Sequence, residues 1–398
     1  MIKLSFLGDI MCKATMIKSY KVNDKYDFSS IFSEVKPLLA TSDYVFANLE
    51  TPISYDNNSL TNVKFCFNSP FEFAQAVYEA GIHFVATANN HCLDRGIKGI
   101  ESTVKSLDKI GFKHTGIFAN QEELKPLVLE VNGIKIGMVS YTYGTNAFAN
   151  HQYLNSKEKW HVNLFQNQEL SNPIDKLLYT HKDHPICFPY KVIGELMHRG
   201  NMTRPVYERR EADSSCKRKI VKDIRTLKNE SVDLIIMYMH VGGQYNNKPM
   251  AYTKSLTDWL LNLGVNIIVG SHEHVVHGGI FNRMSENKIA TYSLGNFDGV
   301  AGIYEAPFDK MAEYTVVWHV YINDDKWIEK TTYSILKTIP TQDSGIKVVP
   351  CLDLLNENKQ KGIDSQKLID DMISICEVFY GVRCEENMLT SEAELPIM

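Results

Sequence analysis

The sequence contains no hydrophobic run long enough to span a membrane and no excess of positive charge. A membrane-spanning helix needs roughly 18 or more consecutive apolar residues, whereas the opening stretch MIKLSFLGDIM reaches Gly8 and Asp9 after one short apolar run. That run also lacks a small-residue cleavage site, so we expect a first β-strand rather than a signal peptide. The formal net charge is −5, and Lys and Arg are scattered along the chain. We therefore expect neither membrane insertion nor a nucleic-acid partner.

Closely spaced cysteine pairs are also missing. The eight cysteines form no CxxC motif, and the chain has no internal repeat or low-complexity tract. This distribution favours reduced thiols, which are typical of cytoplasmic proteins, over a disulfide framework. With 44% hydrophobic and 22% charged residues, the composition is that of a globular protein. We therefore predict a cytoplasmic globular protein with reduced cysteines.

The sequence does contain a repeated order of buried strand, polar loop and amphipathic helix. Five apolar runs end in polar residues: KLSFLGDIM, SDYVFANLE, HFVATANNH, VDLIIMYMH and VNIIVGSHEH. Helical periodicity lies between several of them, at Phe71–Ala80, Ile97–Ile110, Lys217–Lys228 and Ser255–Leu263. This alternation predicts an α/β fold, in which functional residues collect at the carboxyl ends of the strands.

Other strand-like segments indicate a second sheet. In LVLEVNGIKIGMVSYTY an Asn-Gly pair separates two apolar runs, which predicts a hairpin and an antiparallel part of the sheet system. The segments NKIATYSLGNF, EYTVVWHVYI and KWIEKTTYSIL follow without long helices between them. A second sheet packed on the first would account for them.

The chain divides into a main domain at residues 1–340 and a helical C-terminal extension, residues 341–398, packed on the same domain. In the extension, Asp364–Val382 has the pattern of one amphipathic helix. Within the main domain, periodicity fades between residues 146 and 215, and we interpret this segment as a lid-like insertion. We interpret its His181 and His184 as surface or lid residues rather than ligands.

Polar side chains with metal-binding chemistry stand at the ends of the predicted strands. They are Asp9, Asn48, Glu50, Asn89, Asn90, His91, His240, His272 and His274. One such residue is readily explained as a helix cap or turn, but their recurrence at five strand ends points to a shared site. Carboxylate, amide and imidazole donors without thiolates suit a pair of divalent ions such as Mn²⁺, Zn²⁺ or Fe. Two such ions are typical of hydrolases, in which they polarise the electrophile and generate hydroxide near neutral pH.

At these residues the sequence resembles the CapA family of poly-γ-glutamate capsule synthesis proteins, within the calcineurin-like metallophosphoesterase superfamily. The resemblance rests on GD, NLE, ANNHCLDRG, MHVGGQY and GSHEHV, in this order, between about Met1 and Phe297. It implies a four-layer α/β/β/α sandwich with metals at one edge. By motif, the resemblance assigns Asp9 and His274 to the first metal, Glu50 to a bridging position, and Asn90, His240 and His272 to the second metal. It places His91 at the scissile group.

The sequence departs from the family and superfamily patterns at four positions. Met11 stands where the superfamily has a His, and a thioether is a poor ligand for a hard divalent ion. Val241 and Gln244 replace a Trp and a carboxylate, and Glu273 replaces a Pro. If its segment is extended, Glu273 points away from its neighbours, so we expect it to face solvent, with a replacement ligand as the alternative. Reduced metal occupancy, altered metal preference and loss of turnover all stay open.

Four further residues are candidates for the site. Asp94 lies three residues after His91 and could orient its imidazole, with a helix N-cap as an equal alternative. Arg95 could clamp an anionic group of a substrate, although a solvated surface role is favoured. In SLGNFDG, Asn296 and Phe297 match a strand-end motif of the family and are expected to line the site, with a plain turn as the alternative.

These observations predict a hydrolase of phosphoester or related bonds that depends on two divalent ions. His91 and Asp94 are its predicted catalytic residues, and its expected substrate is a small or polymeric anion. One alternative, favoured by Met11, is a non-catalytic module that binds an acidic polymer or a partner enzyme. Another is γ-glutamyl amide chemistry at the same site. A role in capsule formation rests on the resemblance alone.

Overall fold

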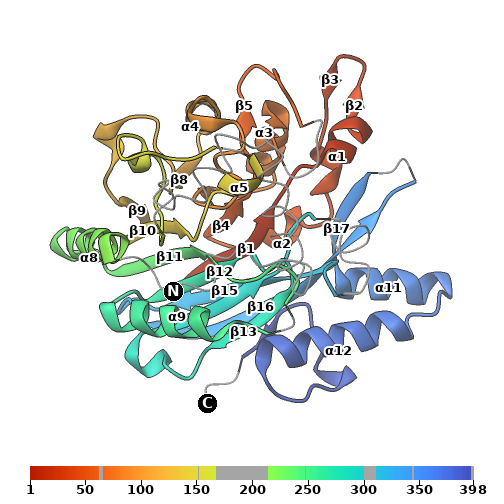
Figure 1. The fold of residues 1–398 in the computed structure, drawn as a ribbon. Helices are drawn as coiled ribbons and strands as arrows, with labels where there is room; N and C mark the ends of the chain where they lie inside the picture. Colours follow the sequence, from red (N-terminus) through yellow and green to blue (C-terminus); the bar gives the residue numbers. More distant parts are fainter. Residues whose placement is uncertain are drawn as a thin grey trace, which may run out of the picture.

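The computed structural model describes residues 1–61, 66–150, 152–166, 214–246, 248–299, 311–342 and 345–395. In these residues two β-sheets pack face to face, and helices cover their outer faces (Figure 1). This is the four-layer α/β/β/α sandwich that the sequence predicts, and the fold class is confirmed.

The larger sheet contains the first strand of the chain. Its strands are β1 (Ile2–Ile10), β4 (Tyr44–Leu49), β7 (Phe84–Ala86), β8 (Lys113–Thr115), β15 (Tyr314–Ile322), β16 (Ile328–Pro340), β17 (Ile346–Pro350) and β18 (Ala393–Glu394). They lie in the order β17-β16-β15-β1-β4-β7-β8, and β18 pairs with β16. The strands from β1 to β8 pair in parallel, whereas β15, β16 and β17 are antiparallel to their neighbours. The predicted first strand is thus an inner strand of this sheet.

The smaller sheet has a parallel centre and antiparallel edges. Its strands are β9 (Leu127–Val131), β10 (Ile134–Thr142), β11 (Leu234–His240), β12 (Ile267–Ser271), β13 (Val276–Ile280) and β14 (Ile289–Leu294). They lie in the order β13-β14-β12-β11-β10-β9, with β9 and β13 antiparallel to their neighbours. Asn132 and Gly133 connect β9 to β10 with positive φ angles of 48° and 83°. The predicted Asn-Gly hairpin is therefore present.

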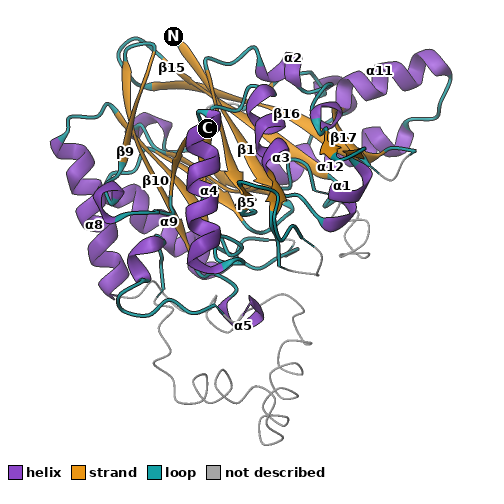
Figure 2. Cartoon of the chain, turned by 90° about the horizontal axis from the view of Figure 1, so that it is seen from above, coloured by secondary structure: helices purple, strands orange, loops and turns teal. Residues whose placement is uncertain are grey.

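Helices cover the outer faces of both sheets. On the larger sheet lie α1 (Ala14–Ser19), α2 (Lys36–Leu39), α3 (Phe71–Glu79) and α4 (Gly96–Ile110), and on the smaller sheet α8 (Ser214–Asn229) and α9 (Ala251–Leu263). Figure 2 shows α8 and α9 together at one side of the strands, and α4 in front of the strands. In α4 the buried residues Ile100, Val104 and Leu107 recur at helical spacing. No described helix has both the length and the apolar character that crossing a bilayer requires.

The C-terminal residues complete the larger sheet as well as adding helices. They form β17 and β18 in addition to α11 (Cys351–Lys361) and α12 (Gln366–Tyr380). Side chains of α12, including Leu368 and Met372, join the apolar core between the two sheets. The extension is therefore continuous with the sandwich rather than an appended helical unit.

The start of the predicted insertion packs into the structure. Leu154, Val162 and Leu164 are buried against Ile100 and Val104 of α4. Residues 152–166 therefore belong to a small apolar cluster beside the sheet. Residues 167–213, which include His181 and His184, lie outside the described residues, so the lid stays a prediction.

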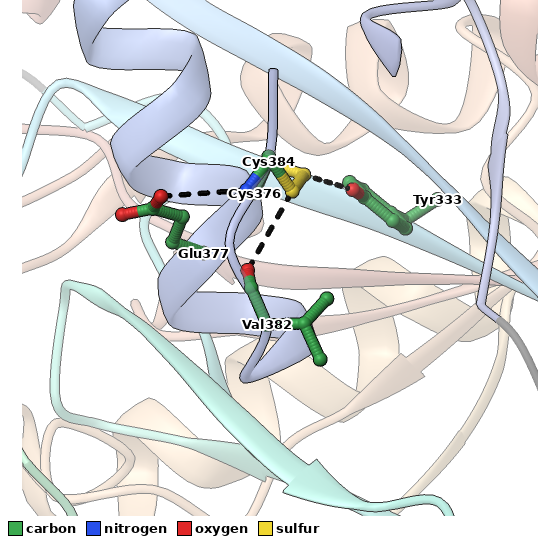
Figure 3. Close-up of a disulfide and its surroundings, with 5 residues drawn as sticks. All are labelled: Tyr333, Cys376, Glu377, Val382 and Cys384. Atoms are coloured by element: carbon green, nitrogen blue, oxygen red, sulfur yellow. Dashed lines mark hydrogen bonds between the residues drawn. A yellow bond between two sulfur atoms is a disulfide. The ribbon is translucent and has the colours of Figure 1, made fainter. Parts of the chain in front are cut away.

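A disulfide bond joins Cys376 of α12 to Cys384 (Figure 3). Gly381 follows the helix with a φ of +80°, and this left-handed residue turns the chain so that Cys384 returns to the helix. The Tyr333 hydroxyl lies 2.8 Å from the Cys376 sulfur, and the Cys384 backbone N–H donates to Glu377. The expectation of eight reduced thiols is therefore wrong for this pair. Disulfides are rare in the cytoplasm, so the cytoplasmic location stays a prediction.

Removing this bond should lower the stability of the fold. A cross-link across a sequence separation of 8 restricts the unfolded chain, and loop-closure entropy gives about 2–3 kcal/mol for a loop of that size. We expect the Cys376→Ser/Cys384→Ser double variant, or reductant added to the wild type, to lower the denaturation midpoint. Reductant should leave the double variant unchanged. Recovery of all eight cysteines as free thiols from protein purified without reductant would contradict the bond.

Candidate metal centre

The two sheets meet where β1 passes the end of β14. The backbone N–H of Asp9 donates to the Gly295 carbonyl at 3.0 Å, and the Phe297 N–H donates to the Asp9 carbonyl at 2.8 Å. A Cβ atom at Gly8 would lie only 1.9 Å from the Gly295 oxygen, so this approach requires glycine. The junction brings the carboxyl ends of strands from both sheets to one edge.

Acidic and imidazole side chains at this edge form two groups that could each hold a metal ion. The first group is Asp9, Glu50 and His274, and the second is Glu50, His240 and His272. Within each group, the candidate ligand atoms all lie within 4.8 Å of one another, and all five residues are buried. Glu50 belongs to both groups. This division agrees with the assignment that the sequence resemblance implies.

The Glu50 carboxylate is buried at the point that the two groups share. Among the described residues, neither of its oxygens has a hydrogen-bond partner, and imidazole nitrogens lie 3.5 Å away on His240 and 3.8 Å away on His274. Burial raises the pKa of Glu50 well above its usual value, and repulsion from Asp9 raises it further. A buried carboxylate is costly unless paired or bound to a metal. The structure therefore fits a cation between these side chains.

The histidines of the second group are held in a neutral state. Burial lowers the pKa of His240 and His272 well below the usual value, and the neighbouring imidazoles lower both further. His240 Nδ1 lies 3.0 Å from the Ser271 hydroxyl, while its Nε2 lies 2.9 Å from Asn90 Oδ1. Neutral imidazole is the form that binds metals, and a hydrogen bond at one nitrogen leaves the other to the metal. Nε2 of His240 therefore faces the candidate centre.

Asp9 is oriented by neighbours from both sheets. Its Oδ1 accepts a hydrogen bond from Asn48 Nδ2 at 2.7 Å, and its Oδ2 accepts one from the His272 backbone N–H at 3.0 Å. His274 Nδ1 lies 3.3 Å from the same Oδ2 and 2.7 Å from Asn296 Oδ1. The candidate ligands are thus fixed by a surrounding layer of polar contacts, as metal sites require.

His91 and Asp94 form a buried pair next to the second group. His91 Nδ1 lies 2.7 Å from Asp94 Oδ2, which also accepts the Phe67 backbone N–H at 2.7 Å. Arg95 occupies the N-cap position of α4, without a side-chain cap. The geometry therefore supports the orienting carboxylate at Asp94 over the alternative of a helix cap.

Three other sequence candidates have structural contacts. The Arg95 guanidinium donates to the Cys66 carbonyl at 3.2 Å, and so holds a neighbouring loop. Phe297 is fully buried and stacks on Phe32 in the outer core of the larger sheet. Met11 takes no part in either metal group, and its backbone N–H donates to the buried Asp298 carboxylate. These side-chain contacts of Arg95 and Phe297, and the backbone contact of Met11, are with residues outside the two metal groups.

The prediction that Glu273 faces solvent is wrong. The chain leaves the extended conformation after β12, because His272 and His274 have φ angles of 93° and 61°. Glu273 is fully buried, and its Oε2 accepts the Gly243 backbone N–H at 3.0 Å. Its carbonyl accepts the Tyr245 N–H at 2.7 Å. Glu273 therefore ties together the loops after β11 and β12, and neither metal group includes it.

Asn90 and His91 also lie in a turn rather than an extended strand, since β7 ends at Ala86. Both side chains nevertheless face the site, Asn90 toward His240 and His91 toward Asn146. Sequence reasoning missed two residues at the start of the predicted insertion: Asn146, which contacts both Asn90 and His91, and Asn150, which contacts Asp94. Their only signal in the sequence was their position after a strand end.

Comparison with known proteins agrees with the geometry of this centre. The model of a family described as bacterial capsule synthesis protein PGA_cap matches residues 3–299. The chain belongs to this family. It is 26% identical over 298 residues to the capsule biosynthesis protein CapA of Bacillus anthracis, covering 74% of this chain and 59% of the relative. It is 22% identical over 344 residues to the PGA biosynthesis protein CapA of Bacillus subtilis (strain 168), covering 84% and 72%.

Family membership confirms the resemblance noted in the sequence and places the chain in a metallophosphoesterase-like superfamily. The match ends close to Asn296, so it includes every member of both metal groups. The C-terminal helices lie beyond it. The chain spans less than two thirds of the Bacillus anthracis relative.

Replacing Glu50 should affect metal binding and the stability of the metal-free protein in opposite directions. We expect Glu50→Ala to lose bound Mn²⁺ or Zn²⁺, because Glu50 is shared by both groups. We also expect it to raise the melting temperature of the metal-free protein, because the variant removes a buried carboxyl group that has no hydrogen-bond partner among the described residues. Elemental analysis and thermal unfolding measure the two effects. The exposed α4 variant Glu101→Ala is the control for both. Metal retention by Glu50→Ala equal to wild type would contradict the assignment.

Proposed function

We propose that this protein is a metal-dependent hydrolase of phosphoester or related bonds that acts in capsule synthesis. The observation that carries the proposal is the buried Glu50 carboxylate shared by two groups of candidate ligands. Asn90 adds a further oxygen donor next to the second group. We propose two divalent ions, Mn²⁺, Zn²⁺ or Fe, held by Asp9, Glu50, His274, Asn90, His240 and His272. When bound, such ions polarise the scissile group and activate water.

The chain's own residues then hold the substrate and move a proton. We propose that His91 donates a proton from Nε2 to the leaving oxygen, while Asp94 holds Nδ1 and stabilises the charged imidazole. Both side chains are buried, so the hydrogen bond between them is shielded from competing water. Asp94 thus acts through His91, as an orienting carboxylate.

The substrate is proposed to be anionic, in keeping with capsule synthesis among the relatives. One assay of the metal-loaded protein distinguishes phosphoester hydrolysis from amide hydrolysis. Its substrates are p-nitrophenyl phosphate, bis-p-nitrophenyl phosphate and γ-glutamyl p-nitroanilide. We expect release of p-nitrophenol from at least one phosphoester and none of p-nitroaniline. Turnover of the anilide alone would replace the proposal with amide hydrolysis. A fully metal-loaded protein inactive on all three would favour a binding module.

His91→Asn should separate catalysis from metal binding. Because His91 belongs to neither metal group, we expect the variant to keep its metal and melting temperature, while the turnover rate falls by about 10²–10⁴-fold, the range typical of a lost general acid. His114→Asn is a matched control, since His114 also pairs with an aspartate, Asp108, at 3.1 Å but lies away from the site. Wild-type rates for metal-loaded His91→Asn would remove His91 from the mechanism.

A further inference from the structure

We propose that Asn146 is a positioning residue that fixes both the Asn90 amide and the His91 imidazole. Asn146 lies between β10 and α5 (Ala147–Asn150), four residues after Thr142, the last residue of β10. Its φ of +51° is in the left-handed region, which asparagine tolerates better than most residues. This backbone conformation places its side chain between Asn90 and His91.

The first contact determines which end of the Asn90 amide faces the second metal group. Asn90 Nδ2 donates to Asn146 Oδ1 at 3.2 Å, while Asn90 Oδ1 lies 2.9 Å from His240 Nε2. An amide has one donor end and one acceptor end. With the donor end bound to Asn146, the oxygen faces the candidate ligands, as a metal ligand must. The reverse orientation would set an NH₂ group among them.

The second contact concerns His91. Asn146 Nδ2 lies 3.4 Å from His91 Nε2, and His91 Nδ1 is already paired with Asp94. Since Asn146 uses its oxygen for Asn90, its NH₂ group is the end that faces His91. Donation from this group stabilises the neutral imidazole with the proton on Nδ1 and the lone pair on Nε2, which is the form that His91 takes once it has given its Nε2 proton to the leaving oxygen. One side chain therefore couples the metal ligand to the proposed proton donor.

Asn150 reinforces the arrangement from the other end of α5. Its Nδ2 donates to Asp94 Oδ1 at 3.1 Å and to the Thr145 carbonyl at 2.7 Å. The Asn150 backbone N–H also donates to the Asn146 carbonyl at 2.9 Å. The short α5 segment thus contacts His91 through Asn146 and Asp94 through Asn150. The role assigned to His91 rests on the proposed function, whereas the role assigned to Asn90 rests only on the metal centre.

Two substitutions separate the contacts. Asn146→Ala removes both, so we expect Mn²⁺ affinity, measured by isothermal titration calorimetry, to fall by about 10–100-fold, the usual effect of losing a residue that orients a ligand. Asn146→Asp can still accept from Asn90 but cannot donate to His91. We expect it to bind Mn²⁺ at least as tightly as Asn146→Ala does, and to lower kcat with little change in KM. Asn132→Asp, at another left-handed asparagine in the β9–β10 hairpin, is the control.

A second measurement does not depend on activity. In protein labelled with ¹⁵N-histidine, with His91→Asn to assign the signal, we expect Asn146→Asp to shift the His91 resonances away from the Nδ1–H pattern, while Asn132→Asp leaves them unchanged. Wild-type Mn²⁺ affinity in folded Asn146→Ala would overturn the Asn90 role. Unchanged His91 resonances in Asn146→Asp would overturn the His91 role. If the wild type proves inactive, the proposed function fails while the calorimetric and NMR results still decide the inference.

Discussion

The backbone junction between β1 and the segment after β14 determines where the site lies. Apolar packing between the two sheets does not by itself fix how their strand ends line up. The close approach of Gly8 and Gly295, with two backbone hydrogen bonds beside it, fixes the position of the strand ends of one sheet relative to those of the other. As a result, Asp9 from one sheet and His272 and His274 from the other reach the same point. The metal centre is thus a consequence of sheet register rather than of any one loop.

This register gathers carboxyl and imidazole groups whose charged forms burial disfavours. The Glu50 carboxyl group has no hydrogen bond from the described residues, burial raises its pKa, and burial lowers the pKa of His240 and His272. Burying these groups without a metal therefore destabilises the folded state, and the free energy gained by the surrounding apolar core must offset this loss. A bound cation would make both carboxylates ligands and so favour their charged forms. Metal binding would then be coupled to folding through Glu50.

Sequence patterning singled out the strand-end residues that lie together here, because strand ends are local features that hydrophobic patterning reveals. The prediction that Glu273 faces solvent was wrong because the segment is not extended. The positive φ angles of His272 and His274 turn the Glu273 side chain inward. The prediction of reduced thiols was wrong for Cys376 and Cys384, because the turn at Gly381 brings the two residues together. Asn146 was missed because it lies where periodicity fades, and only tertiary contacts show its role.

Met11 makes the two halves of the centre unequal. The second group has donors from Glu50, His240 and His272 with Asn90 beside them, whereas the first has Asp9, Glu50 and His274 and lacks the superfamily histidine. Gln244 Nε2 approaches His274 Nε2 at 3.3 Å, but its NH₂ group is a donor and supplies no ligand. An ion in the first group would therefore leave more coordination positions to water or substrate. Such open positions distinguish catalytic from structural metal sites, so the missing histidine is compatible with turnover.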